Sequence, residues 1–128
     1  MAAGAESTDK KALRISHLWL YSKDTAKSIR FYRDVLDFRV VESFPDGALL
    51  HGGGILLGIH REEGDRKSKA GGTLLVLQTN NIERSFEELK QKGVKFLKPQ
   101  IEKAVFGAVA DFKDPDDYLL EIWQPPAR

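Results

Sequence analysis

Hydrophobic and polar residues alternate along several short segments of the chain, and this pattern predicts β-strands. Residues 13–22 form the first such segment, and residues 72–79 form a closely similar one. Each is followed by a residue that can cap a helix and by apolar residues three or four positions apart, which predicts an amphipathic helix. Shorter apolar segments then follow each helix. The two helices are expected from about Thr25 to Leu36, after Asp24, and from Ile82 to Gly93, after Asn81.

The order strand–helix–strand–strand–strand therefore occurs twice, as an internal repeat. Adding 57 or 63 to a residue number aligns the two copies and pairs Leu18 with Leu75, Leu20 with Leu77, Ser28 with Ser85, Leu57 with Leu120 and Ile59 with Ile122. A repeat of this length predicts two similar modules. We expect a flexible tail at residues 1–12, a first module at 13–61, a linker at 62–71 and a second module at 72–128, all within one structural domain.

Composition narrows the class of protein. The chain has 128 residues, 20 basic and 19 acidic side chains, a net charge of +1 and no cysteine. Such a balanced charge provides no general attraction to nucleic acid or to an anionic membrane. The lack of cysteine excludes disulfides and thiolate chemistry and agrees with a cytoplasmic protein. No apolar segment reaches the roughly 20 residues that span a bilayer, and the start of the chain does not resemble a signal peptide.

The alternation within each strand also indicates which side chains share a face. A helix must cover one face of each module's sheet, and the plain aliphatic residues are the natural choice for that face. Polar residues on the opposite face would be costly if it were only core, so we expect a ligand cleft there. The opposite face carries His17, Trp19, Tyr21, Leu56, Gly58, His60, Leu74, Val76, Gln78, Leu119, Glu121 and Trp123.

Two segments of the chain resemble a known family. ISHLWLYSKDTAKSIRFYRDVLDF is similar to the opening strand, helix and following segment of the vicinal-oxygen-chelate superfamily, which includes glyoxalase I, bleomycin-resistance proteins and extradiol dioxygenases. VFGAVADFKDPDDYLLEIWQ is similar to its closing strand. The resemblance implies an α+β fold in which two βαβββ modules form a curved eight-stranded sheet cleft, and it implies a homodimer. Asp37 and Asp117 stand where this family usually has glycine.

The resemblance also implies where a metal would bind. In the family, metal ligands come from the positions that His17, Gly58, Leu74 and Glu121 occupy in this chain. Only the histidine and the glutamate can bind a metal, and a divalent ion usually needs three or four ligands. His60 is either a third donor or an ordinary histidine at the end of a strand. Of the four metal positions in the two modules, one therefore carries an imidazole, one carries a carboxylate and two carry no metal ligand.

Three functions follow from these residues. We favour a small-molecule-binding protein without a cofactor, whose aromatic-walled cleft has an incomplete metal site. The alternatives are a divalent-metal-dependent lyase, isomerase or dioxygenase, and a metal-free acid/base enzyme, both using His17 and Glu121. Trp19, Tyr21 and Trp123 either stack on a flat ligand or pack within the interior or a subunit interface. The predicted ligand-binding residues are Trp19, Tyr21, Leu56, His60, Leu74, Gln78 and Trp123.

Overall fold

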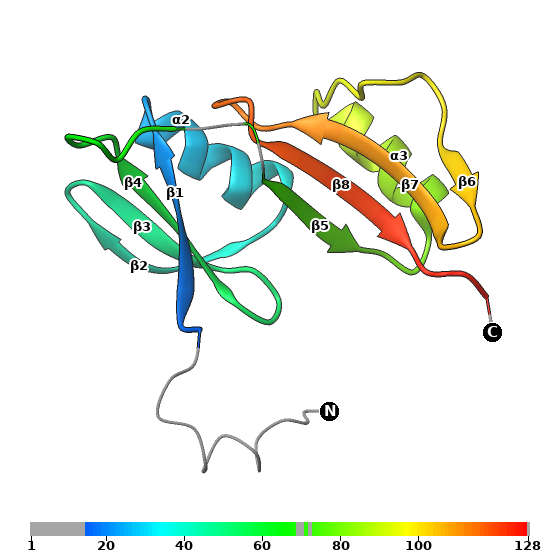
Figure 1. Ribbon diagram of the computed structural model, residues 1–128, viewed down its shortest axis with the longest axis horizontal. Coiled ribbons are helices and arrows are strands. Elements are labelled where there is room, and N and C mark those ends of the chain that lie inside the picture. Colours follow the sequence, from blue (N-terminus) through cyan, green and yellow to red (C-terminus); the bar gives the residue numbers. More distant parts are fainter. Residues whose placement is uncertain (1–14, 69–70, 72, 128) are drawn as a thin grey trace, which may run out of the picture.

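The computed structural model describes residues 15–68, 71 and 73–127, and it contains the predicted order of elements twice (Figure 1). The first module consists of β1 (His17–Ser22), α2 (Thr25–Arg30), a short π-helix (Phe31–Val35), β2 (Arg39–Phe44), β3 (Gly47–His51) and β4 (Leu56–Arg61). The second consists of β5 (Leu74–Gln78), α3 (Ile82–Gln91), β6 (Glu102–Ala104), β7 (Gly107–Lys113) and β8 (Leu119–Gln124). The predicted tail, residues 1–12, and residues 69 and 70 of the predicted linker lie outside the described residues.

Each module forms its own four-stranded sheet with the same topology. The strand orders are β1-β4-β3-β2 and β5-β8-β7-β6. In each sheet the first and last strands of the module pair in parallel, and the other neighbours pair antiparallel. The prediction of an α+β fold with two βαβββ modules is confirmed. The helices α2 and α3 each lie against one face of their own sheet (Figure 1).

The helix ends follow from local side-chain chemistry. Asp24 and Asn81 precede α2 and α3, and each side chain accepts a hydrogen bond from the backbone N–H three residues later, at 3.1 Å. Such caps satisfy a backbone donor that has no partner within the helix. The predicted helix from Thr25 to Leu36 is correct in its extent but not in its uniformity. Its last turn is widened, because Leu36 N–H donates to the carbonyl oxygen of Phe31, five residues earlier.

Two aspartates adopt the left-handed backbone conformation that favours glycine. Asp37 has a φ of 62° and Asp117 a φ of 67°. These are the positions where the family resemblance led us to expect glycine. Aspartate tolerates this conformation better than most residues do, although the Cβ atom still makes it unfavourable. The turn geometry is therefore retained while the residue type has changed.

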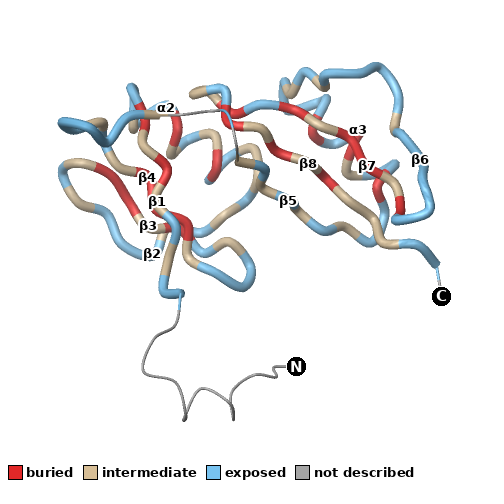
Figure 2. The backbone as a smooth tube through the Cα atoms, viewed as in Figure 1, coloured by how far each residue is buried: buried red, intermediate tan, exposed pale blue. Residues whose placement is uncertain are grey.

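The aliphatic residues predicted to face the helices form one core that both modules share. Leu57, Ile59, Leu120 and Ile122 are at most 5% exposed, and Leu20 is 4% exposed. Figure 2 shows these buried segments along the middle of β4 and β8. Leu75 and Leu77 are half-buried against the same cluster. Leu18 is the exception at 40% exposure. Period-two alternation thus assigned the core face of each sheet correctly.

A buried hydrogen bond joins the two modules. The Tyr32 hydroxyl, at the end of the first helix, donates to Asp114 Oδ2 in the turn between β7 and β8 at 2.8 Å. The other carboxylate oxygen accepts backbone N–H groups from Asp116 and Tyr118 at 2.8 and 2.9 Å. Burial raises the pKa of Tyr32 far above its ordinary value, and the Asp114 charge adds to this effect. Burial also raises the pKa of Asp114, while its hydrogen bonds act in the opposite direction.

The described helices are short, and none of them is long and apolar enough to cross a lipid bilayer.

Candidate functional site

An aromatic cluster covers the face of the first sheet that α2 leaves open. Trp19 lies at its centre, with the rings of His17, Phe44 and His60 at centroid distances of 5.0, 5.9 and 5.4 Å. The angles between these rings and the indole are 88°, 79° and 86°, so all three contacts are edge-to-face. Tyr21 extends the cluster through His60 at 5.9 Å. The structure brings together the predicted residues of β1 and β4 and adds Phe44 from β2.

Gly58 lies directly beneath the Trp19 ring. A Cβ atom at residue 58 would overlap carbon atoms of the indole. In the family this position supplies a metal ligand, so the side chain of Trp19 occupies the space that a carboxylate or imidazole there would need. Any larger residue at position 58 would therefore have to displace the indole. Gly58 and Trp19 therefore form one packing arrangement, in which the lack of a side chain at residue 58 leaves room for the indole.

Hydrogen bonds orient the two histidines of this face. His60 Nδ1 lies 2.7 Å from the carbonyl oxygen of Arg61, so this nitrogen donates and Nε2 is the acceptor of the neutral ring. His17 Nδ1 lies 3.0 Å from the hydroxyl of Ser16. The aromatic cluster therefore contains polar atoms at its margins. A ligand that stacks on the rings could also hydrogen-bond there.

A hollow of about 340 Å³ lies beside the open edge of β1. Its lining residues are Leu18, Trp19, Leu20, Tyr21, Asp65, Arg66, Lys67, Thr73 and Tyr118. Two of the predicted stacking residues, Trp19 and Tyr21, therefore border a concave region. Its volume is at the lower end of the range for small-molecule sites, which begins at about 300 Å³.

The open face of the second sheet carries a pair of carboxyl groups. Glu121 on β8 and Asp111 on β7 are direct partners in the antiparallel register. The pKa of Glu121 is raised to about 7, chiefly by burial, then by the adjacent Asp111 and least by Glu102. Asp111 Oδ1 is buried and has no hydrogen-bond partner within the described structure. A shared proton between the two carboxyl groups would relieve this repulsion.

Most of the remaining predicted residues lie on strands next to this carboxyl pair, and Val76 pairs with Glu121 in the parallel register. Trp123 lies two residues after Glu121 on the same face, and its Nε1–H donates to the carbonyl oxygen of Phe106 at 2.8 Å. Leu74 and Val76 on β5 are 45% and 48% exposed. Gln78 at the end of β5 is exposed, whereas Leu56 on β4 is half-buried. These side chains occupy the predicted faces, and their role in ligand binding stays a prediction.

Within one chain, the structure does not bring the predicted imidazole and carboxylate into contact. His17 belongs to the first sheet and contacts Ser16 and Trp19, whereas Glu121 belongs to the second sheet and interacts with Asp111. Neither His17 nor Glu121 lines any of five well-formed cavities in the described part of the chain.

The residues at the family's metal positions do not fit a divalent ion in a single chain. Gly58 has no side chain and lies under an indole, and Leu74 is apolar. Among the described residues, no group of three or more histidine, aspartate or glutamate side chains is arranged to hold a metal ion.

Asp111 and Phe44 are the residues of these faces that sequence reasoning missed. Asp111 could have been found by counting back from the turn at residues 114–117, because an antiparallel pair places it opposite Glu121. Phe44 follows a register shift in β2 between Val40 and Glu42. A bulge of this kind changes which residues share a face, so simple alternation did not assign Phe44.

The fold and these two open sheet faces define a two-module βαβββ protein. Comparison with known protein families supports this classification. A model of the glyoxalase/bleomycin resistance protein/dioxygenase superfamily matches residues 14–122. This chain belongs to that superfamily.

Two relatives and one structural neighbour are similar to this chain. A virulence protein of Salmonella typhimurium is 29% identical over 122 residues, covering 87% of this chain and 83% of that protein. Its crystal structure has a TM-score of 0.67, with 28% identity and coverage of 91% and 99%. A lactoylglutathione lyase of Schizosaccharomyces pombe is 26% identical over 150 residues, covering 92% of this chain and 49% of that enzyme, so the chain spans about half of it. TnmS3, an antibiotic binding protein from a Streptomyces, shares the fold with a TM-score of 0.73 at 21% identity, covering 91% and 99%.

Proposed function

We propose that this protein binds a flat, partly apolar small molecule, with the indole of Trp19 as the principal contact. One observation carries the proposal: Trp19 lies at the centre of an aromatic cluster on a sheet face that no helix of the described chain covers. Aromatic surfaces with a few polar atoms at the margin are the usual form of a small-molecule site. The hollow beside Trp19 and Tyr21 supports the same assignment.

The geometry of the cluster supports stacking as the mode of binding. The three neighbouring rings stand nearly perpendicular to the indole, so none of them stacks flat on it. Edge-to-face neighbours hold an aromatic ring in a defined orientation. A flat ligand would add the parallel, offset contact that this cluster lacks. The proposal needs no cofactor.

The open face of the second sheet supports a second candidate function, acid/base catalysis without a metal. Glu121 has a pKa raised to about 7, chiefly by burial and then by Asp111. A carboxyl group with such a pKa exchanges protons readily near neutral pH. In this alternative Glu121 is the acid/base group, and the neighbouring Asp111 helps to keep the pKa of Glu121 raised. His17 contributes only if another chain brings it close. A metal-dependent lyase reaction, suggested by the name of the yeast relative, would need ligands that positions 58 and 74 do not supply.

We also propose that the protein forms a homodimer. Leu74 and Val76 are large apolar residues, and nearly half of each is exposed on the open face of the second sheet. Contiguous exposed apolar residues commonly mark a contact surface. A cytoplasmic location agrees with the absence of cysteine but remains part of this proposal. Sedimentation equilibrium tests the dimer directly, and a monomer at all concentrations would contradict it.

Tryptophan fluorescence tests the proposed function. In a Trp123→Phe variant, Trp19 is the only tryptophan, so quenching by a fused-ring probe such as acridine reports on the first sheet alone. We expect saturable quenching. An aromatic contact is worth about 0.5–1.5 kcal/mol beyond buried area, so Trp19→Ala should weaken probe binding roughly 2- to 12-fold. Because this variant lacks the reporting indole, its affinity is followed by the fluorescence anisotropy of acridine itself, with the parent measured in the same way. The solvent-exposed Val41→Ala is the matched control, and it should leave probe affinity unchanged.

Two results would contradict the proposal. One is the absence of saturable quenching with any planar probe. The other is a loss of stability on Trp19→Ala as large as core truncations produce, roughly 3–5 kcal/mol, which would make Trp19 a core residue.

A further inference from the structure

The repeat creates two corresponding junctions between the modules, and a turn at each begins with an equivalent backbone hydrogen bond. In the second module, Asp114 N–H donates to the carbonyl oxygen of Tyr118 at 3.0 Å after β7. In the first module, Gly52 N–H donates to the carbonyl oxygen of Ile55, also at 3.0 Å, after β3. Both bonds close the turn between the last two strands of a module. Gly52 is therefore the counterpart of Asp114.

The helices show the same correspondence. Adding 57 to the number of Tyr32 gives Leu89, and both residues are buried on the core side of their helices. At the first junction Tyr32 reaches across to the carboxylate of Asp114. At the second junction the corresponding residues are Leu89 and Gly52, which offer neither a hydroxyl nor a carboxyl group. One junction is thus filled by a phenol ring and its hydrogen bond, and the other has no such group.

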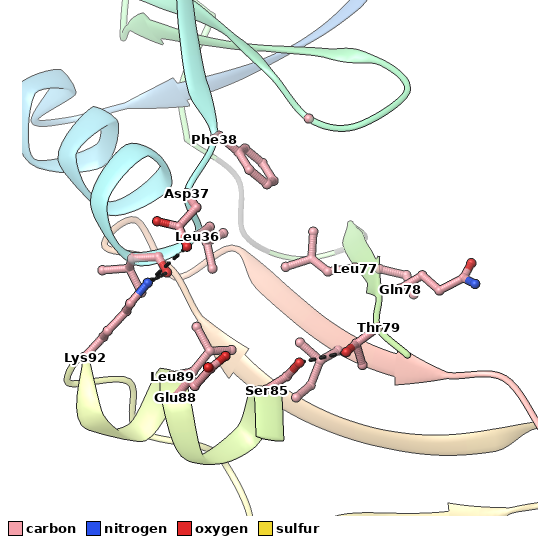
Figure 3. Close-up of a pocket in the computed structure, with 14 residues that line it drawn as sticks. Leu36, Asp37, Phe38, Leu77, Gln78, Thr79, Ser85, Glu88, Leu89 and Lys92 are labelled. Atoms are coloured by element: carbon pink, nitrogen blue, oxygen red, sulfur yellow. Dashed lines mark hydrogen bonds and ion pairs between the residues drawn. The ribbon is translucent and has the colours of Figure 1, made fainter. Parts of the chain in front are cut away.

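A cavity of about 330 Å³ lies at the second junction. Figure 3 shows Leu36 and Phe38 entering it from the first module, Leu77 from β5 and Leu89 from α3. The remaining lining residues are Val35, Asp37, Gly52, Val76, Gln78, Thr79, Ser85, Glu88, Lys92 and Ile122. The cavity is separate from the aromatic cluster of the proposed ligand site, because none of that cluster's rings lines it.

The polar groups at the margin of the cavity favour a neutral ligand that donates a hydrogen bond. Lys92 Nζ lies 3.2 Å from Asp37 Oδ2 and 3.3 Å from the carbonyl oxygen of Val35, so its charge is already compensated. Glu88 adds a second carboxylate, and the three ionisable side chains together carry a net charge of −1. An anionic ligand would be repelled there. A hydroxyl group could donate to a carboxylate, as Tyr32 does at the other junction.

We propose that this cavity is a second binding site, for small neutral phenols of one or two rings. The aromatic ring would lie against Leu36, Leu77 and Leu89, in the place that corresponds to the ring of Tyr32. The hydroxyl group would donate to Asp37 or Glu88 at the margin. The site goes beyond the proposed function, because it involves other residues and requires a ligand hydroxyl group that donates to a carboxylate.

Nuclear magnetic resonance titration tests the proposal on the whole chain. We expect 2-naphthol to produce saturable amide shifts in residues 36–38, 77–79 and 85–92, with a dissociation constant on the order of millimolar, as is typical of so small a ligand. The anionic analogue 2-naphthoate should bind at least about tenfold more weakly. Shifts confined to β1 and β4, no saturation, or equal binding of naphthoate would each overturn the proposal.

A cavity-filling variant provides the second test. Leu89→Phe should occupy the space and weaken naphthol binding at least about tenfold, whereas the exposed control Leu97→Phe should leave it unchanged. If Leu89→Phe does not fold, Leu36→Phe fills the cavity from the first module. Unchanged naphthol affinity in the folded variant would refute the site. Quenching of Trp19 by acridine should persist in either variant, so failure of this site and failure of the proposed function are distinguishable.

Discussion

The junction between Tyr32 and Asp114 offers the sharpest test of how the two modules are held together. Replacing Tyr32 with phenylalanine keeps the ring, which is fully buried, and removes only the hydroxyl that donates to Asp114 Oδ2. The carboxylate is 5% exposed, so water cannot easily replace the lost donor. Leaving a buried acceptor without a partner costs about 1–3 kcal/mol, and a charged acceptor belongs in the upper half of that range.

This magnitude converts into a readily measured change in melting temperature. The unfolding entropy of a chain of 128 residues is about 0.27 kcal/mol/K, so 1 kcal/mol corresponds to roughly 4 °C. For the upper half of that range, Tyr32→Phe should therefore lower Tm by about 7–11 °C. Differential scanning calorimetry is the measurement. Tyr21→Phe is the matched control, because no hydrogen bond from that hydroxyl is found in the described part of the chain, and surface changes usually stay within about 0.5 kcal/mol.

The loss should also depend on pH in a defined direction. Burial raises the pKa of Asp114 in the folded state above the ordinary value of 3.8. The stability that this difference in pKa contributes is therefore fully present below pH 3.8 and is lost as pH rises through the pKa of the folded state. The Tyr32 hydroxyl lowers that pKa, and removing it raises the pKa further. Tyr32→Phe should therefore be more destabilising at pH 7 than at pH 4. A Tm change equal to that of Tyr21→Phe, or a larger effect at pH 4, would refute this reasoning.

Two further predictions concern turns and charge. Asp117→Gly should raise Tm by about 2 °C. The reason is that relief of the left-handed strain, about 1–2 kcal/mol, outweighs the entropy cost of glycine, about 0.5–1 kcal/mol. A lower Tm by calorimetry would contradict this. Glu121 has a pKa raised from 4.5 to about 7, so its contribution to stability should be lost as pH rises through that range. Asp111→Asn should lower the pKa of Glu121 and so reduce this loss of stability. Urea unfolding curves at pH 5 and pH 8 measure the difference, and an unchanged pH dependence would show that the two carboxyl groups are not linked.

Much of the fold could be predicted from the sequence because the relevant signals are local. Alternation along the strands placed Leu20, Leu57 and Leu120 on the core side, and all three are buried. Helix caps could likewise be assigned from the single residues Asp24 and Asn81, since a capping side chain bonds within its own first turn. Signals of this kind do not depend on where other segments lie.

The candidate site was less predictable because its geometry depends on side-chain packing and on register. The sequence shows that position 58 lacks a metal ligand, but it does not show that the indole of Trp19 takes up the space. That outcome depends on the rotamer that the neighbouring rings allow. The pairing of Asp111 with Glu121 depends on the register that the turn between β7 and β8 imposes. Sequence alternation alone specifies neither.

The placement of one sheet relative to the other explains why His17 and Glu121, which were expected to share a site, lie on separate sheets. Both residues lie on the predicted open faces, but a face assignment does not say how the two sheets are oriented toward each other. That orientation depends on contacts between modules, and the buried Tyr32–Asp114 bond is one of them. A tyrosine in a helix and an aspartate in a turn are ordinary residues in sequence, and only their meeting across the two modules gives them this role.

The asymmetry of the repeat then has a physical consequence. If both junctions contained a tyrosine and an aspartate, the two modules would be held equally at each of them. Instead Leu89 and Gly52 leave a cavity, and a Cβ atom at Gly52 would come within 2.9 Å of the Ile55 carbonyl oxygen. An aspartate therefore cannot be introduced at that position without moving the turn. One junction specifies how the modules are held, and the other, lacking that bond, is where the chain has room for a ligand.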